Sequence, residues 1–175
     1  MTSAISLSAL QFISPDSRCH SFGADGNGYA KGEGFGVLVL KRLSDAIADG
    51  DVIRAVVRAT ATNQDGRTPG ISQPSQAAQE KLIREAYRSG GLDLASTRLF
   101  EAHGPGTKLG DPIEAGAIKS VFQKHRSPDD PMHIGAVKAN IGHLEATAGL
   151  AGLIKTILSL EKGIIPPIAG LKEVN

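Results

Sequence analysis

The 175-residue sequence contains no tryptophan and only one cysteine, Cys19. A single cysteine excludes an internal disulfide framework and any zinc site that needs several thiolates. An excess of charge of one sign is also missing, because 19 basic residues face 18 acidic ones. This balance gives no electrostatic footprint for nucleic acid or for an anionic membrane surface. We therefore expect no metal, no nucleic-acid partner and no membrane partner.

Long hydrophobic runs are missing as well. The longest candidate, 146–154, is interrupted by Lys155, whereas a membrane span needs about 20 residues. The first residues lack the basic start of a secretory signal and the arginine of a transit peptide. Because 41% of the residues are hydrophobic, the chain has enough apolar surface for a packed core. We expect a soluble protein of a reducing compartment, the cytoplasm.

The apolar segments alternate between strand-like and helix-like patterns. The patterns predict strands over 35–40, 52–62, 99–102 and 134–138. They predict helices over 43–48, 76–88, 112–124 and from about 143 to 162. Apolar residues cover much of the circumference of the last helix, which indicates a buried helix. The alternation is typical of a layered α/β fold with parallel or mixed strands.

Two histidines, His103 and His143, each lie in a glycine-flanked loop just after a predicted strand. Taken singly, each is better explained by a helix cap or a hydrogen-bonded core group. In α/β folds, however, catalytic groups gather at the carboxyl ends of strands. With Lys138 five residues before His143, the set suits stabilisation of negative charge on an enolate or thioester oxygen. The other histidines, His20, His125 and His133, lie in polar loops and are interpreted as surface residues.

Three further polar residues accompany this set. Asp111 is interpreted as the N-cap of a helix whose first position is Pro112. Glu145 is either a first-turn carboxylate favoured by the helix dipole or a partner of Lys138. Thr107 bonds a ligand or its own loop, and the sequence leaves both alternatives open.

Four segments, in order along the chain, resemble signatures of one family. The stretch EAHGPGTKLGDPIEA resembles the E-A-H-G-T-G-T-x-x-G-D-P-I-E-A motif of β-ketoacyl synthases. The stretch VKANIGHLEATAGLAGLIK resembles their V-K-S-N-I-G-H-x-E-A-x-x-G-x-A-G-x-I-K motif. Two others, SPDSRCHSFGADGNGYAKGEGFG and NQDGRTPGISQPSQAAQEKLIREAY, look like segments of ketosynthases from modular type I polyketide synthases. KGIIPP is similar to the fungal, highly reducing type.

The resemblance implies a thiolase-like fold, a layered α-β-α-β-α core that is usually a homodimer. It also implies that the chain is an incomplete ketosynthase domain. Residues 1–50 would be the end of its N-terminal half, and 51–175 most of its C-terminal half without the last hairpin.

The implied activity is a decarboxylative Claisen condensation in polyketide or fatty-acid biosynthesis, and NQDGRTPG favours the polyketide context. The phosphopantetheine arm of an acyl carrier protein would carry the malonyl and acyl thioesters, and no cofactor would be bound directly. By resemblance, His103 and His143 polarise the malonyl thioester carbonyl and stabilise the enolate, and Lys138 orients the site. Thr107 would contact substrate, with Asp111 and Glu145 as supporting residues.

The sequence also departs from the family pattern. Pro105 replaces a threonine whose hydroxyl faces the pantetheine arm. The family's nucleophilic cysteine lies in a D-T-A-C-S-S-S motif upstream of everything present, whereas Cys19 lies in SRCHSF. We therefore expect no nucleophile in this chain and no condensing activity in isolation. The alternative is a non-catalytic protein that keeps the fold for binding or dimerisation.

Overall fold

The computed structural model describes residues 2–70 and 72–175, without the side chains of residues 2–4. Two short strands, β1 (Leu99–Glu101) and β2 (His133–Gly135), form a parallel pair at the centre of the molecule. Leu99 is aligned with His133, and Glu101 with Gly135. The carboxyl ends of the strands therefore lie at one edge, from which the two predicted histidine loops depart.

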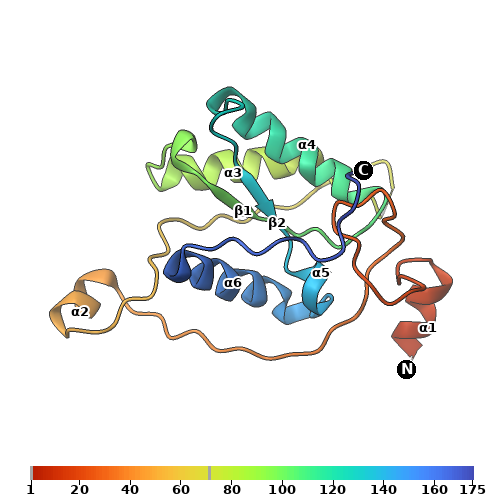
Figure 1. Ribbon diagram of the computed structural model, residues 1–175, viewed down its shortest axis with the longest axis horizontal. Coiled ribbons are helices and arrows are strands. Elements are labelled where there is room, and N and C mark those ends of the chain that lie inside the picture. Colours follow the sequence, from red (N-terminus) through yellow and green to blue (C-terminus); the bar gives the residue numbers. More distant parts are fainter. Residues whose placement is uncertain (1, 71) are drawn as a thin grey trace.

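Helices cover both faces of this pair (Figure 1). On one face lie α3 (Gln76–Ser89) and α4 (Gly110–Phe122), which pack against each other. On the other face lies α6 (Ala148–Lys162), preceded by the short helix α5 (Lys138–Ile141). The remaining helices, α1 (Thr2–Ala9) and α2 (Leu43–Ala48), lie at the periphery. The arrangement is a helix–sheet–helix sandwich, as the α/β pattern predicts.

The buried core lies between the strand pair and α4. One face of α4 carries Ala117, Ile118, Val121 and Phe122, whose three- and four-residue spacing places them on one side of a helix. Of these, Ile118, Val121 and Phe122 pack with Phe22 from the N-terminal loop and with small residues at the strand ends. The predicted helix over 76–88 is confirmed in α3, where the Ser75 hydroxyl accepts a hydrogen bond from the Ala78 N–H.

Two predicted strands, 35–40 and 52–62, are wrong. Both segments are extended but unpaired in the part of the chain that the structure describes, and they flank α2 as open loops (Figure 1). Large apolar residues of the segment 35–40 are exposed, with Phe35 at 96% and Val39 at 93%. The sequence pattern reports only the tendency to form a strand. A strand also needs neighbours that satisfy its N–H and C=O groups.

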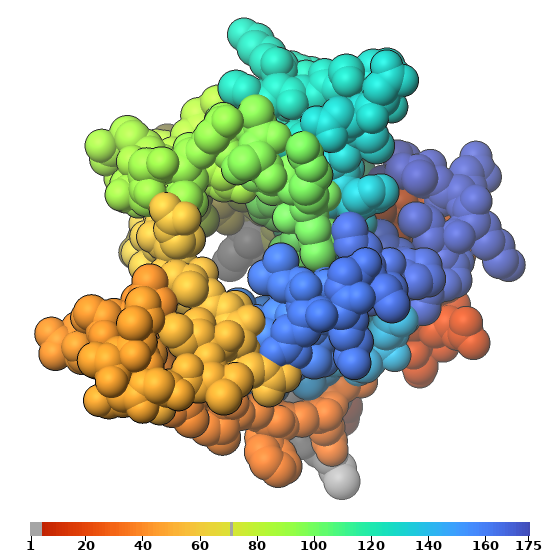
Figure 2. Space-filling model, turned by 60° about the vertical axis from the view of Figure 1, so that its left-hand side comes forward, coloured from red at the N-terminus to blue at the C-terminus, as the bar shows by residue number. Residues whose placement is uncertain are grey.

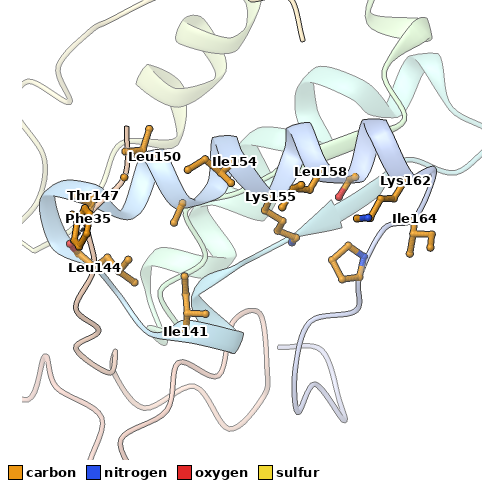
Figure 3. A pocket seen from close by; sticks show the side chains of 14 residues that line it. Phe35, Ile141, Leu144, Thr147, Leu150, Ile154, Lys155, Leu158, Lys162 and Ile164 are labelled. Carbon is orange, nitrogen blue, oxygen red and sulfur yellow. Dashed lines mark hydrogen bonds between the residues drawn. The ribbon is translucent and has the colours of Figure 1, made fainter. Parts of the chain in front are cut away.

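The last predicted helix is not buried all round. Its only buried residues in the described chain are Ala148, Gly152 and Ser159, while Leu158 and Leu160 are exposed. An apolar groove of about 470 Å³ runs along the helix, from Phe35 and Leu144 at one end to Lys162 and Ile164 at the other (Figure 3). The surface is also hollowed between α6 and the segment around 50–62 (Figure 2). The apolar pattern of α6 thus exceeds what the described residues cover.

Three boundaries differ from the predictions. Helix α4 begins at Gly110, so Asp111 lies inside the first turn and is not the N-cap. The second strand ends at Gly135, and Lys138 begins the helical turn α5 rather than ending a strand. A single helix from 143 onward does not form, because Gly142 and Glu145 both adopt positive φ, at 76° and 54°.

Among the described residues, no helix has the length and hydropathy needed to cross a bilayer.

The two phenylalanines at opposite extremes of burial provide a test of this packing. Phe122 is 1% exposed and Phe35 is 96% exposed. We expect Phe122→Ala to lower the free energy of unfolding by about 3–5 kcal/mol, since it leaves a core cavity. The matched change Phe35→Ala should alter it by less than about 0.5 kcal/mol. Urea unfolding followed by circular dichroism measures both, and equal losses would contradict the exposed position of Phe35.

Candidate active site

The predicted site residues meet at the carboxyl edge of the strand pair. His103 follows β1 by two residues, and His143 lies in the loop after α5. Their ring centroids are 5.4 Å apart, with the ring planes nearly perpendicular. Both rings line a cavity of about 680 Å³ together with Pro105 and Thr107. The order of strand and loop in the sequence therefore brings two residues that are forty positions apart into ring contact.

Glycine permits the sharp path of the His103 loop. Gly106 has a φ of +89°, and a Cβ atom there would lie 2.6 Å from the backbone nitrogen of His20. Such a contact would force the two loops apart. The glycine thus lets this loop pack directly on the N-terminal loop.

Asp111 holds the His103 loop in place through hydrogen bonds to its backbone. Its fully buried carboxylate accepts hydrogen bonds from the backbone N–H groups of Phe22 (2.8 Å), Gly106 (3.1 Å) and Thr107 (2.9 Å). Burial raises the pKa of Asp111, and these hydrogen bonds oppose the rise. The Thr107 hydroxyl also lies 3.3 Å from the carboxylate and accepts a bond from the Gly110 N–H. The bond of Thr107 within its own loop, one of the two alternatives, is therefore present in the structure.

Glu114 is a site residue that the sequence analysis missed. Its two carboxylate oxygens accept hydrogen bonds from the backbone N–H groups of His103 (2.7 Å) and Gly104 (2.8 Å). Burial raises the pKa of Glu114, while these two bonds lower it. Glu114 lies three residues after Asp111 and therefore on the same face of α4. That spacing, at the start of a helix that follows a histidine loop, was the available signal.

Both imidazoles are neutral at pH 7. The pKa of His103 is lowered to about 4, because protein atoms surround much of the ring and because Lys138 and His143 lie close to it. The residue remains accessible to solvent. Burial and Lys138 also lower the pKa of His143.

The proton of neutral His143 can be placed on one nitrogen. The backbone N–H of Glu145 donates to Nδ1 of His143 at 2.9 Å, so Nδ1 is an acceptor. A neutral imidazole that accepts at Nδ1 carries its proton on Nε2. His143 is therefore a hydrogen-bond donor through Nε2.

Lys138 is buried, at 4% exposed, at the start of α5. Burial lowers the pKa of its ammonium, and the nearby carboxylate of Glu114 opposes this change. The preceding residue, Val137, is held by the ion pair of Glu101 and Lys155, which the sequence analysis missed. Glu101 accepts a hydrogen bond from the Val137 N–H at 2.7 Å and pairs with Lys155 at 2.6 Å.

Of the two alternatives for Glu145, the pairing with Lys138 is not what the structure contains. Glu145 Oε1 lies 3.0 Å from Lys31 Nζ instead. The reason is the left-handed backbone of Glu145, which places it in a separate 3₁₀ turn (Glu145–Thr147) beside the segment that contains Lys31.

Cys19 is a buried thiol, at 3% exposed, whose sulfur accepts a hydrogen bond from the Ala30 N–H at 3.1 Å. Burial raises its pKa, which disfavours the nucleophilic thiolate. Its neighbour His20 is half-buried rather than on the surface, with one ring nitrogen near Asp16 and the other near Asp25. His125 and His133 are exposed, as predicted.

Two neutral imidazoles in the wall of one cavity, with a buried ammonium close to them, suit the stabilisation of a developing oxyanion. Solved structures to which this chain is similar include ketosynthases. The chain superposes with a TM-score of 0.95 on the ketosynthase from module 6 of the bacillaene synthase of Bacillus subtilis, at 41% identity over 99% of this chain and 31% of that one. An oxazolomycin ketosynthase domain from Streptomyces albus gives a TM-score of 0.94 at 42% identity, over 99% and 30% of the two chains. The chain is thus part of a thiolase-like α/β domain.

Two family models match the sequence. The beta-ketoacyl synthase C-terminal domain matches residues 54–172, and the N-terminal domain matches residues 2–46. The chain belongs to the β-ketoacyl synthase family.

The curated relatives are fungal polyketide synthases. A highly reducing polyketide synthase of Fusarium mangiferae is 61% identical over 98% of this chain. A reducing polyketide synthase of Alternaria solani is 60% identical over 97% of it. The chain spans about 7% of the length of each of these relatives.

The lowered pKa of His103 predicts a pH dependence of stability. The unfolded chain binds a proton at this residue below about pH 6.5, whereas the folded chain does so only near pH 4. The stability contribution of neutral His103 is therefore lost as the pH falls from 6.5 toward 4. We expect His103→Gln to reduce the drop in urea midpoint between pH 7 and pH 5. The exposed control His125→Gln should leave the drop unchanged, and an unchanged drop in both variants would contradict the shift.

The Asp111 hydrogen bonds predict a large loss of stability when the carboxylate is removed. Asp111→Ala leaves several buried N–H donors unpaired, each at a cost of about 1–3 kcal/mol. We expect the free energy of unfolding to fall by at least about 3 kcal/mol. The matched control is Asp129→Ala at an exposed position, which should be neutral. Similar unfolding curves for the two variants would show that Asp111 does not hold the loops together.

Proposed function

We propose that this chain supplies the charge-stabilising part of a polyketide synthase ketosynthase site. The reaction is the decarboxylative Claisen condensation of a malonyl thioester with an acyl thioester. The observation that carries the proposal is the His103–His143 ring contact at 5.4 Å in the wall of a cavity, next to buried Lys138. The ketosynthase relatives support it.

The steps follow from this arrangement. The bond between the malonyl C2 and its carboxylate breaks, carbon dioxide leaves, and the electron pair moves onto the thioester oxygen. N–H donors of His103 and His143 stabilise that enolate oxygen, and both rings are neutral at pH 7, so each carries one proton to donate. The enolate carbon then attacks the acyl carbonyl, a C–C bond forms, and the acyl C–S bond breaks to release the thiolate that carried the acyl group.

The remaining residues position the two histidines or the substrate. Asp111 and Glu114 hold the His103 loop through its backbone, and Glu145 holds His143 through Nδ1. Burial keeps the imidazoles neutral, and Lys138 adds to this effect and contributes a positive potential near the oxyanion. The phosphopantetheine arm of an acyl carrier protein enters the cavity past Pro105 and Thr107. The proposal also includes a homodimer. In it, residues 1–50 belong to the N-terminal half of the ketosynthase domain and residues 51–175 to its C-terminal half.

The acyl-carrying thiol is not Cys19 in this proposal. Its burial and raised pKa support this assignment. The chain in isolation is then a catalyst for decarboxylation of the malonyl thioester but not for condensation.

The test is to incubate the chain with malonyl- and acyl-carrier protein and to measure carbon dioxide and β-ketoacyl product. We expect carbon dioxide but no condensation product. His143→Ala and His103→Ala should each lower carbon dioxide release by about 10²–10³-fold, the usual loss for one oxyanion donor. The matched control His125→Ala should retain full release.

Three results would overturn parts of this proposal. Condensation product that disappears in Cys19→Ser would make Cys19 the nucleophile. Carbon dioxide release that is equal in the unaltered chain and both histidine variants would remove the assigned roles. The absence of any release from the unaltered chain would favour the alternative, a protein that keeps the fold for binding or dimerisation.

A further inference from the structure

The segment from Tyr29 to Gly32 lies directly against His143. The backbone N–H of His143 donates to the Ala30 carbonyl at 2.7 Å, and the Gly32 N–H donates to the His143 carbonyl at 2.9 Å. Both backbone groups of His143 are therefore bonded to a segment more than 110 positions away in the sequence. The contact is close, because a Cβ atom on Gly142 would lie 3.1 Å from the Gly32 nitrogen.

Two side chains of the same segment reach the His143 loop. The Tyr29 ring lies 5.1 Å from the His143 ring, and Lys31 Nζ lies 3.0 Å from Glu145 Oε1. The pKa of Glu145 is lowered, first by its hydrogen bond with Lys31. The pKa of Tyr29 is raised by burial and then by the charge of Glu145. The carboxylate of Glu145 is thus held between two groups of the segment while its own N–H faces Nδ1 of His143.

The backbone conformation of Glu145 depends on its contact with Lys31. Its φ of +54° is strained for a residue other than glycine. Strained residues of this kind persist where surrounding contacts hold them in place. In this loop, the ion pair with Lys31 is such a contact. If it is removed, the turn can relax and the N–H of Glu145 can leave Nδ1.

We propose that Lys31 is a positioning residue for His143, acting through Glu145. By holding the Glu145 turn, Lys31 keeps the backbone N–H on Nδ1 and so keeps the imidazole proton on Nε2. Only the catalytic role of the His143 tautomer rests on the proposed function. The tautomer itself is a property of the folded chain, so the proposal stands or falls without an activity measurement.

The experiment measures the tautomer of His143 by long-range ¹H–¹⁵N correlation in the chain labelled with ¹⁵N-histidine at pH 7.5. The His143 signals are assigned by their loss in His143→Gln. The unaltered chain should show His143 almost wholly protonated at Nε2. In Lys31→Met, the ratio of Nδ1–H to Nε2–H forms should rise about two- to five-fold, the range expected for loss of one half-exposed ion pair.

Two controls separate this role from a general loss of charge. Lys31→Arg keeps the cation and should give the tautomer ratio of the unaltered chain. Lys41→Met removes a lysine whose side chain is equally exposed, at 38%, and pairs with Asp49 and Asp51 beside α2, so it should have no effect. His20, held between Asp16 and Asp25, is an internal reference that should not change in any variant.

A double-variant cycle tests the route through Glu145. In a Glu145→Gln background the carboxylate is already gone, so Lys31→Met should produce no further change. An unchanged His143 tautomer in Lys31→Met, or an equal effect in both backgrounds, would overturn the proposal. If Lys31→Met loses its amide dispersion, Lys31→Gln in the same cycle is subject to the same two outcomes.

Discussion

The arrangement of the site depends on one buried carboxylate. Asp111 is completely shielded from solvent and accepts backbone hydrogen bonds from the His103 loop and from Phe22 in the N-terminal loop. Neither loop has regular secondary structure, so neither has an internal ladder that would fix its path. A charged acceptor at the start of α4 supplies that order, because hydrogen bonds to an ionised group are stronger than neutral ones. The loops are consequently defined by their common bonds to α4 rather than by their own conformational preferences.

The remainder of the structure shows how unevenly the chain is stabilised. Around α4 the packing is dense, and the largest fully buried side chains of the described residues, such as Phe122 and Ile118, lie there. The segments at 35–40 and 52–62 expose their apolar residues, and the groove along α6 is open. The order of the site thus comes from the half of the fold that is fully packed, and the exposed apolar segments contribute little to it.

The sequence predicts those features that depend on local pattern or on strand order. Helix α3 follows from the helix-like pattern of 76–88, and the meeting of His103 with His143 follows from their positions after predicted strands. The sequence does not show that the segment 35–40 lacks a pairing partner, because a strand is defined by partners that its own sequence does not specify. The role of Glu114 and the partner of Glu145 were missed for a related reason. Glu114 binds backbone N–H groups, which any residue can supply, and Glu145 pairs with Lys31, which lies more than 110 positions away in the sequence.

Helix α4 contributes both to the candidate active site and to the hydrophobic core. Its first turns carry the two carboxylates, Asp111 and Glu114, that bind the backbone around His103, and its last turns insert Val121 and Phe122 into the core. A helix is a stiff rod, and a shift at one end displaces the other by a similar amount. The fit of the core therefore bears on the position of the His103 ring in the wall of the cavity. Substitutions that a core would ordinarily tolerate as changes of volume become, in this helix, changes in the alignment of the two imidazoles.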